Sequence, residues 1–392
     1  MSKSFIFCIN RATDISLAQI LYLHKPHDVE MKIVATAFHS NSEFGEWRKP
    51  KNLTRWLKNE DIKAIKEFFR GDYQQCDNSR QLKELFKKDN SVGIFPGREP
   101  FVIKDICENG AICLSAVRDY FNRFLDVHHF YKTKDIKIFL NSNAWVDEKL
   151  CERWQMYEPG INDYSQDYQY LKDNESSILF CDPYISYKTL LDELGRDKIR
   201  EQLKIPLEKK VAMVSLRRGD ANLTYQKNDN NFFENTIEKM KELQQAGFYI
   251  ISRRRNSVDD LVNRRVNSAE NTRYQEFAKY IDLDLTGWDN FPNKIWQACY
   301  VSDLMLLADM SGICRREAVV CELPILLPKY DEEVYNRNYN NGWDPAMKDL
   351  HSRRLFVTTV EECLSEEYLK RLKEYKKMWH TGDADLFWKK LL

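Results

Sequence analysis

The chain has 392 residues, 43% of them hydrophobic and 31% charged, which is the balance of a folded globular protein with room for two domains. Lysine plus arginine number 60, as do aspartate plus glutamate, so the formal net charge is zero. A neutral chain has no global field with which to hold a nucleic acid or an acidic membrane. We therefore expect no nucleic-acid partner, and we expect any anion site to be local.

Ten cysteines are scattered singly, without a CxxC pair or a histidine at zinc-finger spacing. Most lie in apolar runs, as in Phe5-Ile6-Phe7-Cys8, which predicts buried free thiols in a reducing compartment. The N-terminal stretch turns polar too quickly for a secretory signal, and no run of 18 apolar residues occurs. The sequence therefore predicts a cytoplasmic protein.

Short β-branched or aromatic runs alternate with longer helical patterns in the first half of the chain, which is typical of parallel sheets with helical crossovers. The expected strands are 4–9, 32–37, 91–95, 136–140 and 177–181. The expected helices are 15–23, 52–69, 103–124 and 148–156. Together they predict one α/β domain.

A helix expected over 190–203 ends at Lys204-Ile205-Pro206, because proline disfavours helix in the residue before it. We place a domain boundary just ahead of this helix. The further strands expected are 211–216, 248–252, 280–285, 304–307 and 324–327, and the further helices are 232–245, 295–302, 313–321, 366–378 and 385–392. The domains expected are an acceptor-side domain (1–186), a donor-binding domain (187–365) and C-terminal helices (366–392).

The strongest candidate site follows the apolar strand 211–216, where Arg217-Arg218-Gly219-Asp220 begins. Open α/β sheets bind ligands at the carboxyl ends of their strands. The planar guanidinium groups of Arg217 and Arg218 suit the oxygens of a diphosphate, and Asp220 would then lie close to the reacting carbon. The alternative is that one arginine pairs with Asp220 and the loop only caps the sheet.

A second candidate is the turn Ser311-Gly312, which follows the strand 304–307 and opens a helix containing Arg315 and Glu317. The free N–H groups and the dipole of a helix start favour an anion, so this turn could hold a phosphate. Glu317 could reach a ribose hydroxyl. The alternative is an ordinary helix cap, since serine and glycine are common there.

Four further features are weaker candidates. Arg253, in a run of arginines at a strand end, could add a phosphate or base contact, or belong to a solvated face. Glu158, in a turn after a helix, could act as general base or acid toward an acceptor, or be a surface residue. Asp229 lies in a loop before the helix 232–245. The triplet Asp282-Leu283-Asp284 has the Asp-x-Asp form of some metal-dependent transferases, but metal use would compete with the arginines, so we expect no metal site.

The assembled motifs resemble those of glycosyltransferases of the GT-B type. The stretch 194–220 is similar to the start of the donor domain in bacterial surface-polysaccharide transferases, and its arginine loop resembles that of the fucosyltransferase superfamily. Ser311-Gly312, Glu317-Ala318 and Leu323-Pro324 are similar to the donor-binding helix of the same group. The resemblance implies an α/β fold of two Rossmann-like domains facing a cleft, with C-terminal helices packing back across them. The donor-binding residues it implies are Ser215, Arg217, Arg218, Arg253, Ser311, Gly312, Arg315 and Glu317.

The same resemblance implies transfer of a sugar from a nucleotide-activated donor to a bacterial cell-surface glycan, lipopolysaccharide O-antigen or capsule. The acceptor would be an oligosaccharide or a lipid-linked glycan, no cofactor would be required, and the protein could associate peripherally with the inner face of the membrane. Ser215 or Leu216 stands where fucosyltransferases often carry a histidine, which counts against a fucose donor.

Three alternatives stay open. One is a β-Kdo transferase that uses CMP-Kdo, with Asp220 or Asp229 as nucleophile and Glu158 assisting deprotonation of the acceptor. Another is a nucleotide-sugar epimerase or a polyol-phosphate transferase on the same fold. The third is a non-catalytic protein that binds a nucleotide or a glycan.

Overall fold

The computed structural model describes residues 3–9, 12–36, 59–76, 79–89, 91–96, 110–114, 136–140, 178–181, 183–215, 232–254, 275–286, 294–307, 315–329, 354–379 and 382–392. The chain divides into two compact units: the first comprises Met1–Tyr187 with Met378–Leu392, and the second comprises Lys188–Lys377. The chain thus enters the second unit after Tyr187 and returns to the first at Met378. The C-terminal segment 366–392 is shared between the two units.

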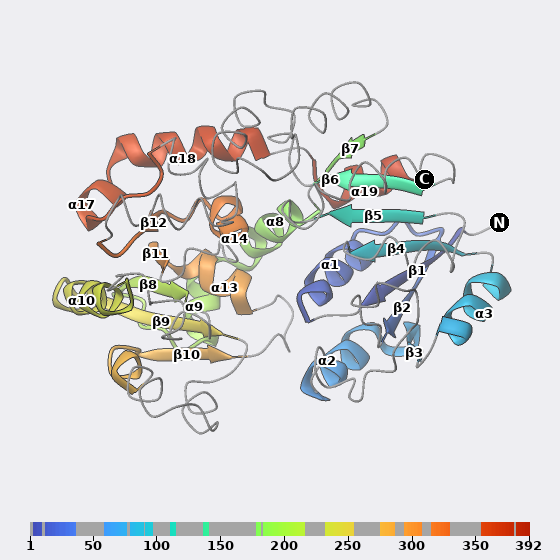
Figure 1. The fold of residues 1–392 in the computed structure, drawn as a ribbon, viewed down its shortest axis with the longest axis horizontal. Helices are drawn as coiled ribbons and strands as arrows, with labels where there is room; N and C mark the ends of the chain where they lie inside the picture. The colour runs from blue at the N-terminus through green and yellow to red at the C-terminus, as the bar shows by residue number, and fades with distance from the viewer. Residues whose placement is uncertain are drawn as a thin grey trace, which may run out of the picture. The chain divides into compact units, whose positions relative to one another are not determined.

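The first unit is built on a seven-stranded parallel sheet with the strand order β3-β2-β1-β4-β5-β6-β7 (Figure 1). Its strands are β1 (Lys3–Ile9), β2 (Val29–Thr36), β3 (Tyr73–Cys76), β4 (Val92–Pro96), β5 (Gly110–Leu114), β6 (Ile136–Leu140) and β7 (Ile178–Phe180). Its helices are α1 (Ala12–Leu23), α2 (Asn59–Phe69), which continues into the 3-10 turn η2 (Arg70–Asp72), α3 (Ser79–Asp89) and the C-terminal α19 (Ala384–Leu391). The parallel α/β character expected of this half is confirmed.

One expectation for this half fails, and two elements were not expected. The helix expected over 103–124 is wrong in its middle, because Gly110–Leu114 forms strand β5 between β4 and β6. This run of five apolar residues has no periodicity that separates a buried strand from a buried helix. Strand β3 and helix α3 were not expected at all. The helix expected over 148–156 lies outside the described residues.

Helix α19 completes the core of the first unit. Trp388 is 1% exposed, packs edge-on against Phe5 at 5.2 Å between ring centroids, and donates its indole N–H to the carbonyl of Leu21 at 2.9 Å. Phe387 contacts Phe139 at 4.4 Å between centroids. Phe5 lies in β1 and Phe139 in β6, with β4 and β5 between them in the sheet. One short helix therefore covers several strands.

The second unit has a five-stranded parallel sheet with the order β10-β9-β8-β11-β12 (Figure 1). Its strands are β8 (Lys210–Ser215), β9 (Phe248–Arg254), β10 (Leu283–Thr286), β11 (Leu304–Leu307) and β12 (Ile325–Leu326). Its helices are α8 (Ile185–Leu194, which begins in the first unit), α9 (Arg196–Gln202), α10 (Phe232–Gln245), α13 (Lys294–Val301), α14 (Arg315–Val320), α17 (Val360–Cys363) and α18 (Glu366–Trp379, which ends in the first). The bounds expected for α10 and β11 are confirmed residue for residue.

The single helix expected over 190–203 is wrong, since it is two helices that meet at Gly195. Gly195 has φ of 82°, in the left-handed region that glycine enters without a steric penalty. Helix α8 also begins at Ile185, ahead of the expected boundary at 186/187. Apolar residues occur on both sides of the break, as at Leu194 and Ile199, so the apolar pattern does not reveal it.

Tyr368 of α18 fixes the outermost strand of the second sheet. Its buried hydroxyl accepts the backbone N–H of Ile325 at 2.9 Å and lies 2.9 Å from the carbonyl oxygen of Leu355. Burial raises the pKa of Tyr368 above its usual range, so the hydroxyl keeps the proton that it donates. A short strand at the margin of the sheet thereby gains a partner on its open side.

The carboxylate of Asp303, just ahead of β11, organises the amino end of the second sheet, by which we mean the end where its strands begin. Asp303 Oδ2 accepts the backbone N–H of Val211 at 2.7 Å, and the N–H of Asp303 donates to the carbonyl of Val211 at 2.8 Å. The same carboxylate pairs with Arg196 at 2.7 Å and with Arg200 at 3.3 Å. The starts of β8 and β11 are thus joined to α9.

Arg200 is the buried member of this group, with 6% of its surface exposed. Its guanidinium donates to the carbonyls of Val301, Leu207 and Lys209 at 2.9, 3.2 and 3.0 Å, in addition to its pair with Asp303. Burial lowers the pKa of Arg200, and neighbouring Arg196 acts in the same direction, while Asp303 opposes both. A buried cation is tolerated here because its donors are used.

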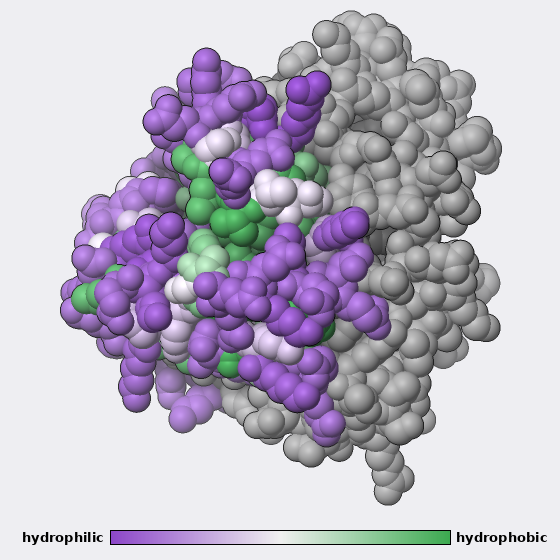
Figure 2. Space-filling model, turned by 90° about the vertical axis from the view of Figure 1, so that its left-hand side faces the viewer, coloured by the Kyte–Doolittle hydropathy of each residue, from purple (hydrophilic) through white to green (hydrophobic). Residues whose placement is uncertain are grey.

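The described surface is mainly hydrophilic, and most of the described cysteines are buried. The described surface in Figure 2 is mainly hydrophilic, with one compact hydrophobic area framed by hydrophilic residues. Cys8, Cys76, Cys181, Cys299 and Cys363 are buried free thiols, as expected. Among the helices of the described ranges, none combines the length and the apolar character needed to cross a bilayer.

Replacing Asp303 by alanine should destabilise the protein by about 3 kcal/mol, because Arg200 would be left buried without its counter-charge. This is the low end of the range for a buried pair, since the Asp303 side chain retains 27% exposure. Asp282→Ala is the matched control: that carboxylate accepts the N–H of Ile250 at 2.7 Å in the same way but pairs with no arginine of the described ranges, so about 1 kcal/mol is expected. Urea unfolding of both variants measures the difference. Equal losses would show that the arginine pairs contribute nothing.

Candidate functional site

The candidate site lies at the carboxyl end of the second sheet, where its parallel strands finish. Leu307 of β11 pairs with Ser215 of β8, and Leu285 of β10 pairs with Arg253 of β9. Val214 pairs with Ser252, so the next step of the same register places Ser215 level with Arg253. Two of the expected donor-binding residues therefore occupy neighbouring strands at one level, at the end of the sheet where α/β folds bind ligands.

Most of the chemically important candidates lie outside the described residues. These are Glu158, Arg217, Arg218, Asp220, Asp229, Ser311 and Gly312. In the sequence, Arg217 is the second residue after Ser215, which ends β8. The roles expected of these seven residues remain predictions.

Helix α14 carries two candidates, Arg315 and Glu317. It follows β11 and precedes the parallel β12, so as a crossover it begins on the carboxyl side of the sheet. Glu317 lies in its first turn and is half-buried. The described part of this helix is Arg315–Val320, within the expected range 313–321, and Ser311-Gly312 lies outside the described ranges.

Cys321 follows α14 and is not a reactive thiol. Burial is the main cause that raises its pKa, and the negative charge of Glu317 acts in the same direction, whereas Lys188 and Lys376 oppose it. The thiol therefore stays protonated at neutral pH and is a poor nucleophile.

Within the triplet Asp282-Leu283-Asp284, Asp282 has a structural role away from the donor site. Asp282 lies just ahead of β10 and its carboxylate accepts the backbone N–H of Ile250, so it caps the amino end of the sheet. The carboxyl end, with Ser215 and Arg253, is the opposite end. Within the described ranges, no group of three metal-ligating side chains comes together.

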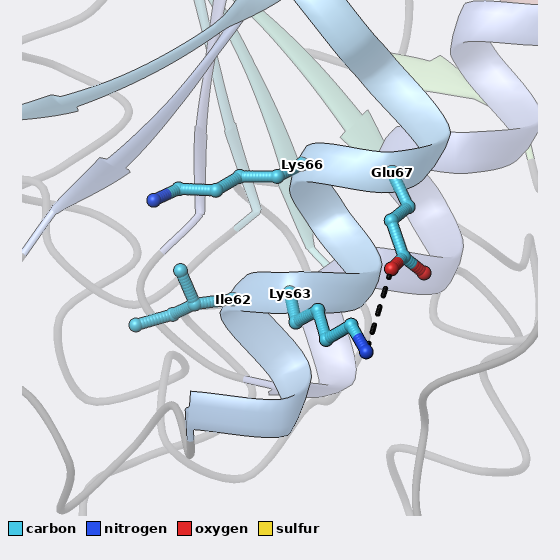
Figure 3. Close-up of a pocket in the computed structure, with 4 residues that line it drawn as sticks. All are labelled: Ile62, Lys63, Lys66 and Glu67. Carbon is cyan, nitrogen blue, oxygen red and sulfur yellow. Dashed lines mark ion pairs between the residues drawn. The ribbon is translucent and has the colours of Figure 1, made fainter.

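A hollow of about 460 Å³ in the first unit lies beside α2 and is lined by Ile62, Lys63, Lys66 and Glu67 (Figure 3). Lys63 pairs with Glu67 at 3.7 Å, and Lys66 lies 5.6 Å from the centre of the Tyr73 ring. All four residues come from one solvent-facing helix, whereas the described candidates, Ser215, Arg253, Arg315 and Glu317, belong to the second unit. The hollow is therefore not part of the candidate site.

Sequence reasoning missed two residues at the carboxyl end. Asn235, in the first turn of α10, donates its side-chain N–H to the backbone carbonyl of Lys329 at 2.7 Å. Lys329 follows β12 by three residues and is exposed. A basic residue shortly after a strand was the available signal, but the contact with α10 has no counterpart in the sequence.

No protein-family model and no curated protein matches the sequence. Solved structures do match it. One is assigned as a UDP-N-acetylglucosamine 2-epimerase from Listeria monocytogenes, with a TM-score of 0.53 and 10% identity over 95% of this chain and 91% of that chain. Another is a variant of the wall teichoic acid polymerase TagF, with a TM-score of 0.52 and 12% identity over 100% of this chain and 89% of that chain.

Likeness at such low identity shows the fold alone. With the two parallel sheets described above, it establishes an α/β fold of two Rossmann-like domains of the GT-B type. The expected fold class is confirmed to that extent. The similarity to the arginine loop of fucosyltransferases concerns residues outside the described ranges and stays a prediction.

Proposed function

We propose that this protein is a glycosyltransferase that moves a sugar from a nucleotide-activated donor to a bacterial cell-surface glycan, either lipopolysaccharide O-antigen or capsule. The observation that carries the proposal is the level placement of Ser215 and Arg253 at the carboxyl end of the second sheet. Strand β8 then leads within two residues into Arg217-Arg218-Gly219-Asp220. Guanidinium groups at this end of a Rossmann-like sheet suit a leaving diphosphate.

The residues divide into three roles. Arg217 and Arg218 stabilise the negative charge that develops on the leaving phosphate. Asp220 acts at the reacting carbon as base or nucleophile, with Asp229 as the other possible nucleophile, and Glu158 assists the acceptor. The remaining donor contacts are Ser215, Arg253, Ser311, Gly312, Arg315 and Glu317. Because arginines neutralise the diphosphate, no metal is required, and the protein would work in the cytoplasm or at the inner face of the membrane.

The names of the similar structures support this class of substrate. One is assigned as an epimerase of a UDP-linked sugar, and the other is a polymerase of a cell-wall polymer. An epimerase is the second candidate, favoured by the TM-score of 0.53. Against it, the donor half contains no histidine between Met213 and Pro328. Epimerisation of a UDP-sugar in the absence of any acceptor would decide for that candidate.

Nucleotide binding is the first test of the proposal. At least one of CMP, GDP, UDP and ADP should raise the melting temperature by several degrees, because a ligand at about 100 times its Kd adds about 2.7 kcal/mol to the native state. A response to CMP alone would favour the β-Kdo alternative. Differential scanning fluorimetry measures the shift, and a flat response to all four nucleotides would contradict the proposal.

Arg217→Ala should remove most of that nucleotide-induced shift and abolish transfer, while the melting temperature without nucleotide stays unchanged. Binding and transfer would be lost because the substitution removes a charge-assisted contact with the phosphates, which contributes about 1.5–3 kcal/mol. Transfer is measured with radiolabelled nucleotide-sugar donors. A wild-type protein that binds nucleotide and acceptor but neither transfers nor hydrolyses the donor would instead be a binding protein.

Glu317→Gln should lower the affinity for the ribonucleotide about tenfold and remove its preference over the 2′-deoxynucleotide, since a carboxylate accepts a ribose hydroxyl more strongly than an amide does. Isothermal titration of both nucleotides measures this. The matched control is Glu322→Gln: Glu322 lies two residues after α14 and pairs with Lys376 at 2.7 Å, so nucleotide affinity should not change. An equal loss for both nucleotides would rule out the ribose contact.

A further inference from the structure

The segment 327–329, which follows β12, is held in place on both sides. The N–H of Leu327 donates to the carbonyl of Val357 at 2.8 Å, and the carbonyl of Lys329 accepts the side-chain N–H of Asn235 at 2.7 Å. Leu327 is 0% exposed and Pro328 is buried. The backbone that carries Lys329 is therefore fixed by two hydrogen bonds and by burial.

The topology places this segment at the carboxyl end of the second sheet. Helix α10 connects the parallel strands β8 and β9, so its first turn, which contains Asn235, lies where β8 finishes. Strand β12 runs parallel to β11, so its continuation leaves the sheet at the same end. In the sheet order, β8 and β11 lie between β9 and β12. The hydrogen bond between Asn235 and Lys329 thus joins the helix that follows β8 to the continuation of β12, and in the sheet order β11 lies between these two strands.

The side chain of Lys329 is exposed and forms no ion pair with any residue that the structure describes. A lysine ammonium is a compact charge that binds phosphate well. Because the backbone at Lys329 is already ordered, contact with an anion would cost only the ordering of the side chain. A fixed backbone with an unpaired charge is the arrangement expected of a binding residue.

We propose that Lys329 binds the phosphate part of the nucleotide donor and that Asn235 is a positioning residue that holds Lys329 in place. This inference rests on the proposed function and extends it to two residues that no motif singles out. It adds the continuation of β12 to the candidate site at the carboxyl end of β8 and β9.

The test compares affinities for a nucleotide and for its parent nucleoside, which lacks the phosphates. The nucleotide is whichever of CMP, GDP, UDP and ADP the wild type binds. Lys329→Gln should weaken nucleotide binding about tenfold, leave nucleoside binding unchanged and raise KM for the donor more than it lowers kcat. Lys329→Arg should retain most of the affinity. Lys209→Gln is the matched control, because Lys209 is exposed and lies ahead of β8 at the amino end of the sheet.

Asn235→Ala should weaken nucleotide binding less than Lys329→Gln does, and the double variant should bind no more weakly than Lys329→Gln alone, because both changes remove one contact. Additive losses, or equal losses for nucleotide and nucleoside, would overturn the inference, as would wild-type affinity in Lys329→Gln. A wild type that binds none of the four nucleotides would overturn the proposed function itself. The two failures are therefore distinguishable.

Discussion

The arrangement of the second unit depends on the carboxylate of Asp303 and the buried guanidinium of Arg200. Asp303 bonds the backbone of Val211 in both directions, and Arg200 bonds the carbonyls that precede β8 and end α13. These hydrogen bonds fix the register of the strands, because a shift by one residue would leave a buried charge or a buried N–H group unpaired. The register fixed at the amino end is the register that brings Ser215 level with Leu307 at the carboxyl end.

The two ends of this sheet therefore have different tasks. At the amino end, Asp282 and Asp303 each accept a backbone N–H of the neighbouring strand, so their charges are used in stabilising the fold. At the carboxyl end, β8 and β9 finish in Ser215 and Arg253-Arg254, and β12 leads to the exposed side chain of Lys329. Parallel strands make this separation natural, because all strands of a sheet begin at one end and finish at the other. Stability and ligand binding can then be changed independently.

Helices, strands and their order were accessible from the sequence wherever local signals agreed. Helix α10 was bounded correctly because its apolar period of 3.6 ends at Gly247, whose φ of 83° requires glycine or a strained residue. The break at Gly195 was hidden, since apolar residues continue on both sides of it. Strand β5 was mistaken for helix because a buried strand carries no alternation of polar and apolar residues.

The candidate site was predictable only in part, because some of its features also leave no local pattern in the sequence. That Arg253 lies near the end of a strand can be predicted from the sequence, and the parallel sheet places its backbone at the carboxyl end. That Ser215 is level with Arg253, or that Asn235 reaches Lys329 across 94 residues of chain, depends on register and crossover geometry that no local pattern records. The Asp-x-Asp triplet shows the same limit, since the sequence does not reveal that Asp282 caps the start of a strand.

The cations at the carboxyl end also bear on why an anion should bind there. The chain is neutral overall, yet Arg253, Arg254 and Lys329 are placed at one end of one sheet, and Arg217 and Arg218 follow within three residues of Ser215. Like charges within about 8–10 Å repel one another without full screening at physiological salt, so cations gathered at one end of a sheet favour the binding of an anion. A diphosphate placed among them would turn that repulsion into attraction. Under the proposed function a phosphate-bearing ligand would relieve this repulsion, and the register that Asp303 and Arg200 maintain keeps Ser215, two residues before Arg217, level with Leu307.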